Sequence, residues 1–133
     1  MDRSDNDVPT GEPVIRTVTM PADTNPAGDI FGGWLMSQMD LAAGSVAARR
    51  GRGRVATVAV EAISFLRPVQ VGDEVSLYAE IVRVGRTSMT IHVEAWRRPR
   101  EAEDLFKVTE ASFTFVALDE ESGRPRPIPP DSG

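Results

Sequence analysis

Residues 33–50 constrain the fold more than any other segment of this chain. They read GWLMSQMDLAAGSVAARR, a run without proline that is too long for one strand, so they predict a helix. Two arginines at the end of the run and the glycine that follows are typical of a helix C-terminus. Before that end, large apolar and small residues surround the axis and leave no wide polar face. We therefore expect a helix that is buried on nearly all sides.

Four segments with strand character follow this helix, and a short one precedes it. Residues 87–96 and 105–118 alternate apolar and polar side chains, which indicates strands with one buried face. Residues 74–84 follow a turn region and predict a further strand, and residues 14–20 predict a short first strand. Residues 54–66 are apolar on both faces, which predicts a central strand of the sheet.

The order of these segments indicates the fold class. One long helix beside consecutive antiparallel strands is typical of an α+β domain and excludes a doubly wound parallel sheet. We expect the helix to lie across the concave face of a curved sheet. Because the helix and one strand are apolar on more than one face, a single copy leaves apolar surface uncovered, which predicts a dimer or a larger assembly.

Length, ends and composition limit the possible functions. The 133 residues correspond to one domain, folded over residues 14–118, with a disordered N-terminal segment (residues 1–13) and a flexible Pro-rich tail (residues 119–133). The net charge of −5 argues against nucleic-acid binding by bulk positive charge. The absence of cysteine excludes disulfides, thiolate catalysis and cysteine-bound metals. Since no apolar run predicts a membrane span or a signal peptide, we expect a cytoplasmic protein without a membrane partner.

Asp40 is the one acidic residue of the predicted helix. Its neighbours one helical turn away on either side include no lysine or arginine, so no ion pair within the helix is available. An ionised carboxylate in apolar surroundings is costly unless it is solvated or hydrogen-bonded. Asp40 therefore either faces a solvent channel or a hydrogen-bonding neighbour, or it serves as a general base or nucleophile toward an electrophilic carbonyl.

The loop before the helix, residues 23–34, is rich in glycine. One interpretation is an ordinary turn and helix cap. The other is functional, because free amide groups at a helix N-terminus can hold an anion or a developing oxyanion. In that interpretation, Asn25 offers an amide that orients a water molecule or a carbonyl group.

Other chemistry has weaker support in the sequence. His92 is the only histidine and lies on the polar face of a predicted strand, so without an evident set of partners we expect it to face solvent. The carboxylates are scattered along the chain, and we therefore predict no metal site. The sequence contains no nucleophile elbow, nucleotide phosphate-binding loop or dinucleotide fingerprint.

Three motifs occur in order: MPADTNPAGDIFGGWLMSQMDLAAGSVAAR, VATVAVEAISFLRPVQVGD and VGRTSMTI. Over residues 14–118 the chain resembles the hotdog-fold acyl-CoA thioesterases of the bacterial YciA type. The resemblance implies a curved antiparallel sheet wrapped around one long central helix, paired as a double-hotdog homodimer with active sites at the dimer interface. It also implies further assembly as a trimer of dimers, which is a hexamer.

The same resemblance implies roles for individual residues. Asp40 corresponds to the catalytic acid of the family, and Asn25 to an asparagine that works with an aspartate of the opposite subunit. The backbone amide of Gly32 or Gly33 would polarise the thioester carbonyl, and this chain has Phe31 where many other hotdog hydrolases have histidine. The resemblance also implies that CoA is bound by Arg67, Gly85, Arg86, Thr87 and Ser88.

The function implied is hydrolysis of acyl-CoA to a free acid and CoA, as in fatty acid metabolism. No metal or redox cofactor is needed, since CoA is part of the substrate and product. The alternative is a non-catalytic acyl-CoA-binding hotdog domain with a regulatory role, against which the presence of Asp40 and Asn25 argues. A hotdog dehydratase would need a catalytic histidine on the loop or the helix, and His92 lies on neither.

Overall fold

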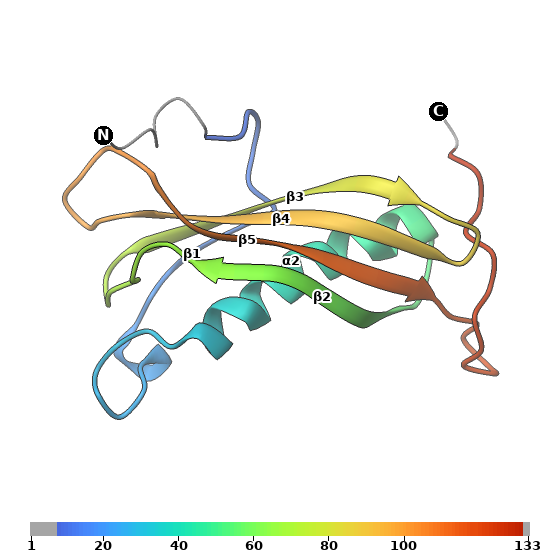
Figure 1. Ribbon diagram of the computed structural model, residues 1–133, viewed down its shortest axis with the longest axis horizontal. Coiled ribbons are helices and arrows are strands. Elements are labelled where there is room, and N and C mark those ends of the chain that lie inside the picture. The colour runs from blue at the N-terminus through green and yellow to red at the C-terminus, as the bar shows by residue number, and fades with distance from the viewer. Residues whose placement is uncertain (1–7, 132–133) are drawn as a thin grey trace.

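The computed structural model describes residues 8–131 and shows one long helix packed on a curved antiparallel sheet (Figure 1). The strands are β1 (Ile15–Val18), β2 (Val55–Phe65), β3 (Glu74–Val84), β4 (Ser88–Arg98) and β5 (Phe106–Ala117). Between β1 and β2 lie a short 3-10 helix, η1 (Pro21–Asp23), and the long helix α2 (Gly32–Gly51). The strand order is β1-β3-β4-β5-β2, with all neighbours antiparallel. The α+β class and the hotdog arrangement are confirmed.

Small side chains allow α2 to lie close to the sheet. The residues of the helix that are buried in the core against the sheet are Leu35, Met39, Ala42, Ala43 and Ala47. The other side of the helix is not covered within one copy, because Leu41 is 60% exposed. Burial on nearly all sides was therefore wrong for the single chain. No helix within residues 8–131 is both long enough and apolar enough to cross a membrane.

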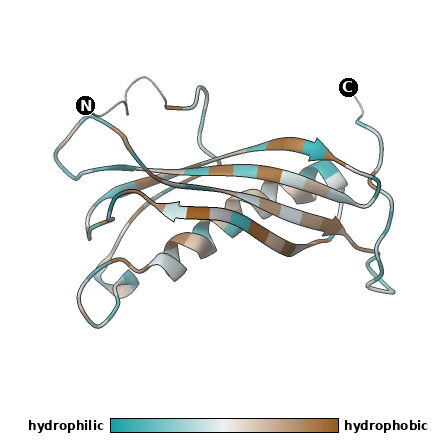
Figure 2. Cartoon of the chain, viewed as in Figure 1, coloured by the Kyte–Doolittle hydropathy of each residue, from teal (hydrophilic) through white to brown (hydrophobic). Residues whose placement is uncertain are grey.

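The alternation expected for the third and fourth long strands is confirmed. On β4, the side chains of Met89, Ile91 and Val93 are buried in the core with α2, whereas those of His92 and Glu94 point to the opposite face. Brown and teal bands along the strands show the same alternation in Figure 2. The sheet thus has an inner face that contacts α2 and an outer face that carries polar side chains.

The strand that was expected at the centre of the sheet lies at its edge. β2 pairs with β5 on one side only, and no other described strand lies along its second edge. Val58 and Phe65 on this strand are 58% and 50% exposed, and Leu66 after it is 59% exposed. The two-sided apolar pattern was recognised correctly, but a pattern cannot tell whether the second neighbour belongs to the same chain.

The C-terminal segment contacts the domain, which its proline-rich composition did not predict. The N–H groups of Arg126 and Ile128 donate to the carbonyls of Ala117 and Arg86 at 2.9 and 2.8 Å. The Ile128 side chain packs against the core. Main-chain hydrogen bonds and one apolar anchor therefore position residues 119–131 along the end of the domain where α2 ends (Figure 1). Of the N-terminal segment expected to be disordered, residues 1–7 lie outside the described residues.

Candidate functional site

The Asp40 carboxylate is held by a neighbouring strand. Thr57 of β2 donates its hydroxyl hydrogen to Asp40 Oδ1 at 2.6 Å. Asp40 is partly exposed, and no lysine or arginine among residues 8–131 forms an ion pair with it. One carboxylate oxygen is thus fixed by a neutral donor, while Oδ2 is available to a ligand or to water.

Thr57 was not identified as a functional candidate from the sequence. The available signal was that Thr57 is one of few polar residues in an otherwise apolar strand. Such a residue is expected to contact a polar partner when its strand packs beside a buried helix. The pairing with Asp40 could not be predicted, because it depends on the angle at which α2 crosses β2.

The start of α2 presents backbone amides that the helix itself does not use. Phe31 precedes the helix and provides no side-chain cap, and the first intrahelical donors to its carbonyl are the amides of Trp34 and Leu35. The N–H groups of Gly32 and Gly33 lie before these donors, at the positive end of the helix dipole. This geometry can stabilise an oxyanion.

Gly32 lies directly beneath an aromatic ring. A Cβ atom built on Gly32 would lie 3.1 Å from Cζ of Phe65, closer than ordinary contact allows without movement of the ring. Phe65 belongs to β2, so the last residue of the edge strand packs over the first turn of α2. The helix start and the end of β2 therefore form one corner of the domain.

Asn25 organises the loop before α2. Its Oδ1 accepts hydrogen bonds from the N–H groups of Ala27 and Asp29 at 2.9 and 3.1 Å. Its own N–H donates to the Asp29 carbonyl at 2.8 Å. The oxygen of the Asn25 side chain is thus engaged within the loop, which leaves the Nδ2 amide as the group that can contact a ligand.

Asp40 and the helix start do not meet in one copy of the chain. Asp40 lies seven residues after Gly33 in a continuous helix, which corresponds to about 10 Å along the helix axis. A general base and an oxyanion donor must both lie about 3 Å from the reacting groups. The two halves of the expected site are therefore separate within the protomer.

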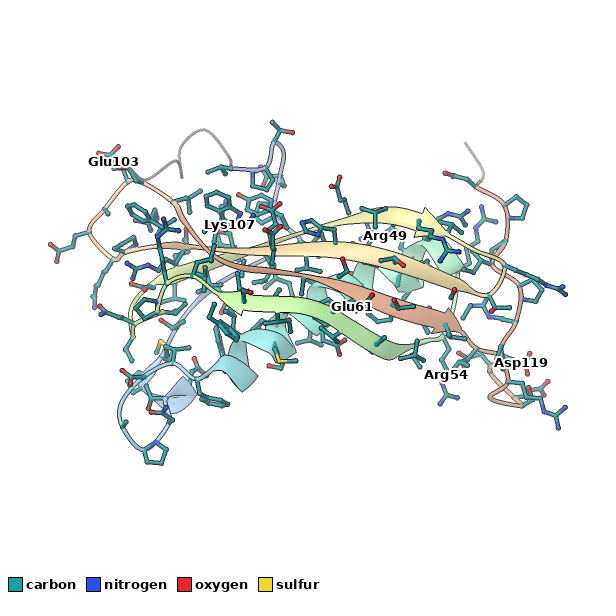
Figure 3. The ribbon with its side chains drawn as sticks, viewed as in Figure 1. Arg49, Arg54, Glu61, Glu103, Lys107 and Asp119 are labelled. Atoms are coloured by element: carbon teal, nitrogen blue, oxygen red, sulfur yellow. The ribbon has the colours of Figure 1, made fainter. Side chains whose placement is uncertain are left out.

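The residues expected to bind CoA are also divided between two ends of the sheet. Arg67 follows β2 and donates from Nη1 to the carbonyl of Lys107 at 2.6 Å, near the start of β5. The β3–β4 hairpin contacts the end of β5, where the Ala117 N–H donates to the Thr87 carbonyl at 2.8 Å. These points are roughly 33 Å apart along the strand. Figure 3 shows the same separation between Lys107 and Asp119.

The hairpin residues Gly85, Arg86, Thr87 and Ser88 are brought together, as expected. The Gly85 N–H donates to the carbonyl of Ser88 at 2.7 Å, which closes the turn. The Arg86 side chain is exposed, and its carbonyl accepts the Ile128 N–H from the C-terminal segment. The turn is therefore fixed by main-chain hydrogen bonds, while the Arg86 guanidinium faces solvent and is available to an anion.

The expectation that His92 faces solvent without partners is wrong. His92 Nε2 lies 3.1 Å from Glu110 Oε1 and 3.3 Å from Glu94 Oε2 on the outer face of the sheet. The β4–β5 register places Glu94 directly opposite Glu110, although the two are far apart in sequence. A hydrogen bond from Lys107, with a smaller contribution from His92, lowers the pKa of Glu110 below its ordinary value of 4.5.

Comparisons with known proteins agree on what the chain resembles. Residues 27–103 match the model of the thioesterase superfamily. An uncharacterized acyl-CoA thioester hydrolase of Zymomonas mobilis is 56% identical over 129 residues, which cover 97% of this chain and 86% of that protein. Acyl-CoA thioester hydrolase YciA of Escherichia coli is 51% identical over 127 residues, covering 93% and 96% of the two chains. The solved structure of HI0827, a hexameric broad specificity acyl-coenzyme A thioesterase, has a TM-score of 0.89 at 44% identity, covering 99% of this chain and 90% of that chain.

The loop geometry predicts a structural effect of substitution at Asn25. Asn25→Ala removes the acceptor of two backbone N–H groups, so hydrogen exchange at Ala27 and Asp29 is expected to accelerate. The free energy of unfolding should fall by about 1 kcal/mol or less, because the loop is exposed. Asn25→Asp keeps an acceptor oxygen and should preserve the protection. Exchange measured by mass spectrometry that is unchanged in Asn25→Ala would contradict this role of the side chain.

Proposed function

Because this chain belongs to the thioesterase superfamily, we propose that it is an acyl-CoA thioesterase, which hydrolyses the thioester bond of acyl-CoA to a free acid and CoA. The observation that carries the proposal is the Asp40 carboxylate, fixed by Thr57 at 2.6 Å and lacking a cationic partner in the helix. Both features suit proton transfer to or from water.

The active unit we propose is a homodimer joined along β2. The long, apolar and unpaired edge of β2 is a surface that a second strand would cover, since unprotected edges otherwise promote aggregation. Antiparallel pairing of two β2 strands about a two-fold axis extends the sheet and places both helices on the same face. The relative HI0827 is hexameric, which supports assembly of three such dimers.

This pairing would join the two halves of the site. A two-fold axis near the middle of β2 places the half of one strand that contains Thr57 beside the half of the partner strand that ends at Phe65. Because Phe65 covers Gly32 in each copy, the helix start of one subunit approaches Asp40 of the other. Each dimer then has two equivalent sites, each built from both chains.

The reaction follows from these groups. Water attacks the thioester carbonyl carbon while Asp40 accepts a proton from it, and the carbonyl electron pair moves onto oxygen. The amide N–H of Gly32 or Gly33 stabilises this oxyanion. When the carbonyl re-forms, the C–S bond breaks, and CoA leaves as a thiolate that takes up the proton. If Asp40 is instead the nucleophile, an acyl–Asp40 anhydride forms as the thiolate leaves, and water then hydrolyses it.

Thr57 and Asn25 would act beside these groups. The Thr57 hydroxyl holds Oδ1 of Asp40, so that Oδ2 faces the attacking water. Asn25 Nδ2 is the part of that side chain left for the substrate carbonyl or the water. The reaction needs no metal or redox cofactor. A cytoplasmic location stays a prediction, consistent with a sequence that contains no cysteine.

Recognition of CoA requires local positive charge, because the chain as a whole has a net charge of −5. The two-fold pairing would set the Arg67 end of one subunit beside the hairpin end of its partner. There the exposed Arg86 guanidinium, with hydroxyls of Thr87 and Ser88, could contact the phosphates. Arg67 is engaged with the Lys107 carbonyl and lies near the Phe106 ring, so we assign it a role in shaping this end of the site.

Substitution of Asp40 tests the function directly. Asp40→Asn keeps the size and the acceptor for Thr57 but removes the base, so kcat for acyl-CoA hydrolysis should fall roughly 10²–10⁴-fold. Thr57→Val should reduce kcat less, because the carboxylate remains. Thiol release from acyl-CoAs of short, medium, long and aromatic chains measures both effects. Full turnover by a correctly assembled Asp40→Asn protein would refute the mechanism, and binding without turnover by the wild type would support the regulatory alternative.

A charge on the open edge tests the dimer. Val58→Asp places a carboxylate where β2 is expected to meet its partner, and light scattering should then detect monomers at micromolar concentration with little thioesterase activity. Val71→Asp is the matched control, since Val71 is 43% exposed and lies outside β2. A wild-type monomer that hydrolyses acyl-CoA would contradict a site shared between subunits.

Substitution of the hairpin arginine tests phosphate recognition. Arg86→Ala should raise KM for acyl-CoA with little change in kcat, because this contact is remote from the reacting carbonyl. The effect should shrink with an acyl-pantetheine substrate, which lacks the nucleotide phosphates. Equal losses on the full and truncated substrates would assign Arg86 to the fold and not to the ligand.

A further inference from the structure

The outer face of the sheet carries a group of polar side chains that the proposed reaction does not use. His92 and Glu94 on β4 and Glu110 on β5 lie here, because their neighbours Ile91 and Val93 face α2. The ligand atoms of these three residues lie within 4.8 Å of one another. The sheet separates them from Asp40, so the inference below does not depend on the proposed function.

In each carboxylate of this group, one oxygen accepts a hydrogen bond from a residue outside the group. Trp96, which is fully buried, donates its Nε1–H to Oε1 of Glu94 at 2.9 Å. Lys107 donates to Oε2 of Glu110 at 2.8 Å. The second oxygen of each carboxylate faces His92 Nε2, at 3.3 Å for Glu94 and 3.1 Å for Glu110. The two carboxylate oxygens that face His92 are therefore oriented by hydrogen bonds to the other oxygen of each carboxylate.

The carboxylate oxygens of this group are better matched to a bound cation than to a neutral histidine. An imidazole Nε2 carries one hydrogen at most, yet two carboxylate oxygens converge on it. Carboxylates directly opposite each other in a sheet repel unless positive charge lies between them. Glu80, opposite His92 on β3, adds a third acidic group, whereas Lys107 supplies a single ammonium. The group has negative charge in excess.

We propose that His92, Glu94 and Glu110 form a binding site for a divalent transition-metal ion such as Zn²⁺. Around such an ion, with bonds of about 2.0–2.2 Å, neighbouring ligand atoms lie roughly 3.0–3.5 Å apart, which matches the two distances from His92. One imidazole with two carboxylates suits Zn²⁺ better than Mg²⁺ or Ca²⁺, which prefer oxygen ligands alone.

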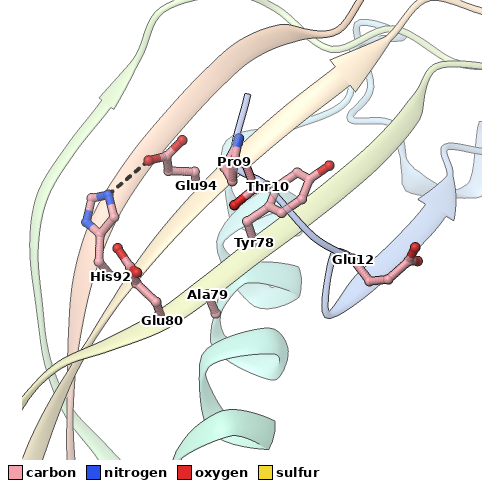
Figure 4. A pocket seen from close by; sticks show the side chains of 8 residues that line it. All are labelled: Pro9, Thr10, Glu12, Tyr78, Ala79, Glu80, His92 and Glu94. Atoms are coloured by element: carbon pink, nitrogen blue, oxygen red, sulfur yellow. Dashed lines mark hydrogen bonds and ion pairs between the residues drawn. The ribbon is translucent and has the colours of Figure 1, made fainter. Parts of the chain in front are cut away.

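The surroundings leave room for water to complete the coordination. A pocket of about 320 Å³ opens beside His92 and Glu94, with Glu80 and Tyr78 among its lining residues (Figure 4). The hydrogen bonds from Trp96 and Lys107 would act as outer contacts that orient the metal ligands. A bound ion would join β4 to β5 through their side chains, in addition to the main-chain ladder.

The composition makes this proposal easy to test, because the chain contains one histidine and no cysteine. Titration of the untagged full-length protein with Zn²⁺ in a calorimeter should show one site per chain. His92→Gln should weaken binding more than about 100-fold, and Glu110→Gln should weaken it at least about 10-fold. Glu103→Gln, at an exposed acid in the β4–β5 connection, is the matched control and should bind as the wild type does.

A spectroscopic measurement identifies the location. In a Trp34→Phe background Trp96 is the remaining tryptophan, and Ni²⁺ bound beside Glu94 should quench its fluorescence. His92→Gln in the same background should abolish the quenching, with circular dichroism confirming that the fold is retained. Absence of Zn²⁺ uptake by the wild type, or equal uptake and quenching after His92→Gln, would overturn the proposal.

Discussion

The close packing of α2 on the inner face of the sheet determines where the groups of the candidate active site lie. Ala42, Ala43 and Ala47 are fully buried at this contact, so the helix approaches the strands closely. Met39 is completely buried and fixes the rotation of the helix about its axis. Asp40, the next residue, consequently lies at the border of the buried side, where the hydroxyl of Thr57 reaches it. A bulkier helix surface would separate these two side chains.

Local features of the sequence predicted most of the fold. Alternation predicted β4 and β5 well, and the apolar run of α2 was expected over residues 33–50 and is found as Gly32–Gly51. The predicted central position of β2 was wrong, because its apolar pattern on two faces was attributed to neighbours in the same chain. The C-terminal segment was assessed by composition alone. Its contacts include main-chain hydrogen bonds, which every residue type except proline can donate, and hydrogen bonds from the guanidinium groups of Arg50 and Arg126 to backbone carbonyls.

The candidate site was predictable in part and for a specific reason. Asp40 could be identified because an acid without a cationic neighbour is unusual in an apolar helix. Thr57 and the partners of His92 could not, because both depend on strand register and helix orientation, which bring together residues distant in sequence. The thioester bond and CoA were predicted from the family resemblance alone, since no spacing of residues specifies a substrate.

The sheet keeps two kinds of chemistry apart. On its inner side, helix α2 carries one carboxylate, Asp40, whose partner on the sheet is the neutral hydroxyl of Thr57, which suits a group that must gain and lose a proton. Its outer face holds several charged side chains in which the carboxylates outnumber the cations, which suits binding of a positive ion. Inward-facing Ile91 and Val93 alternate along β4 with outward-facing His92 and Glu94, so the two faces are separated by one layer of backbone.

The open edge of β2 also has a consequence for the amount of enzyme that is active in a growing cell. In the proposed dimer, the site exists only after two newly made chains have met, so at low abundance its rate of formation rises with the square of chain concentration. Stability measured at one dilution would not apply at another, because folding and association are linked. In the proposed dimer, each newly made chain exposes this apolar edge until it pairs with a second copy, which favours rapid encounter over prolonged existence as a single chain.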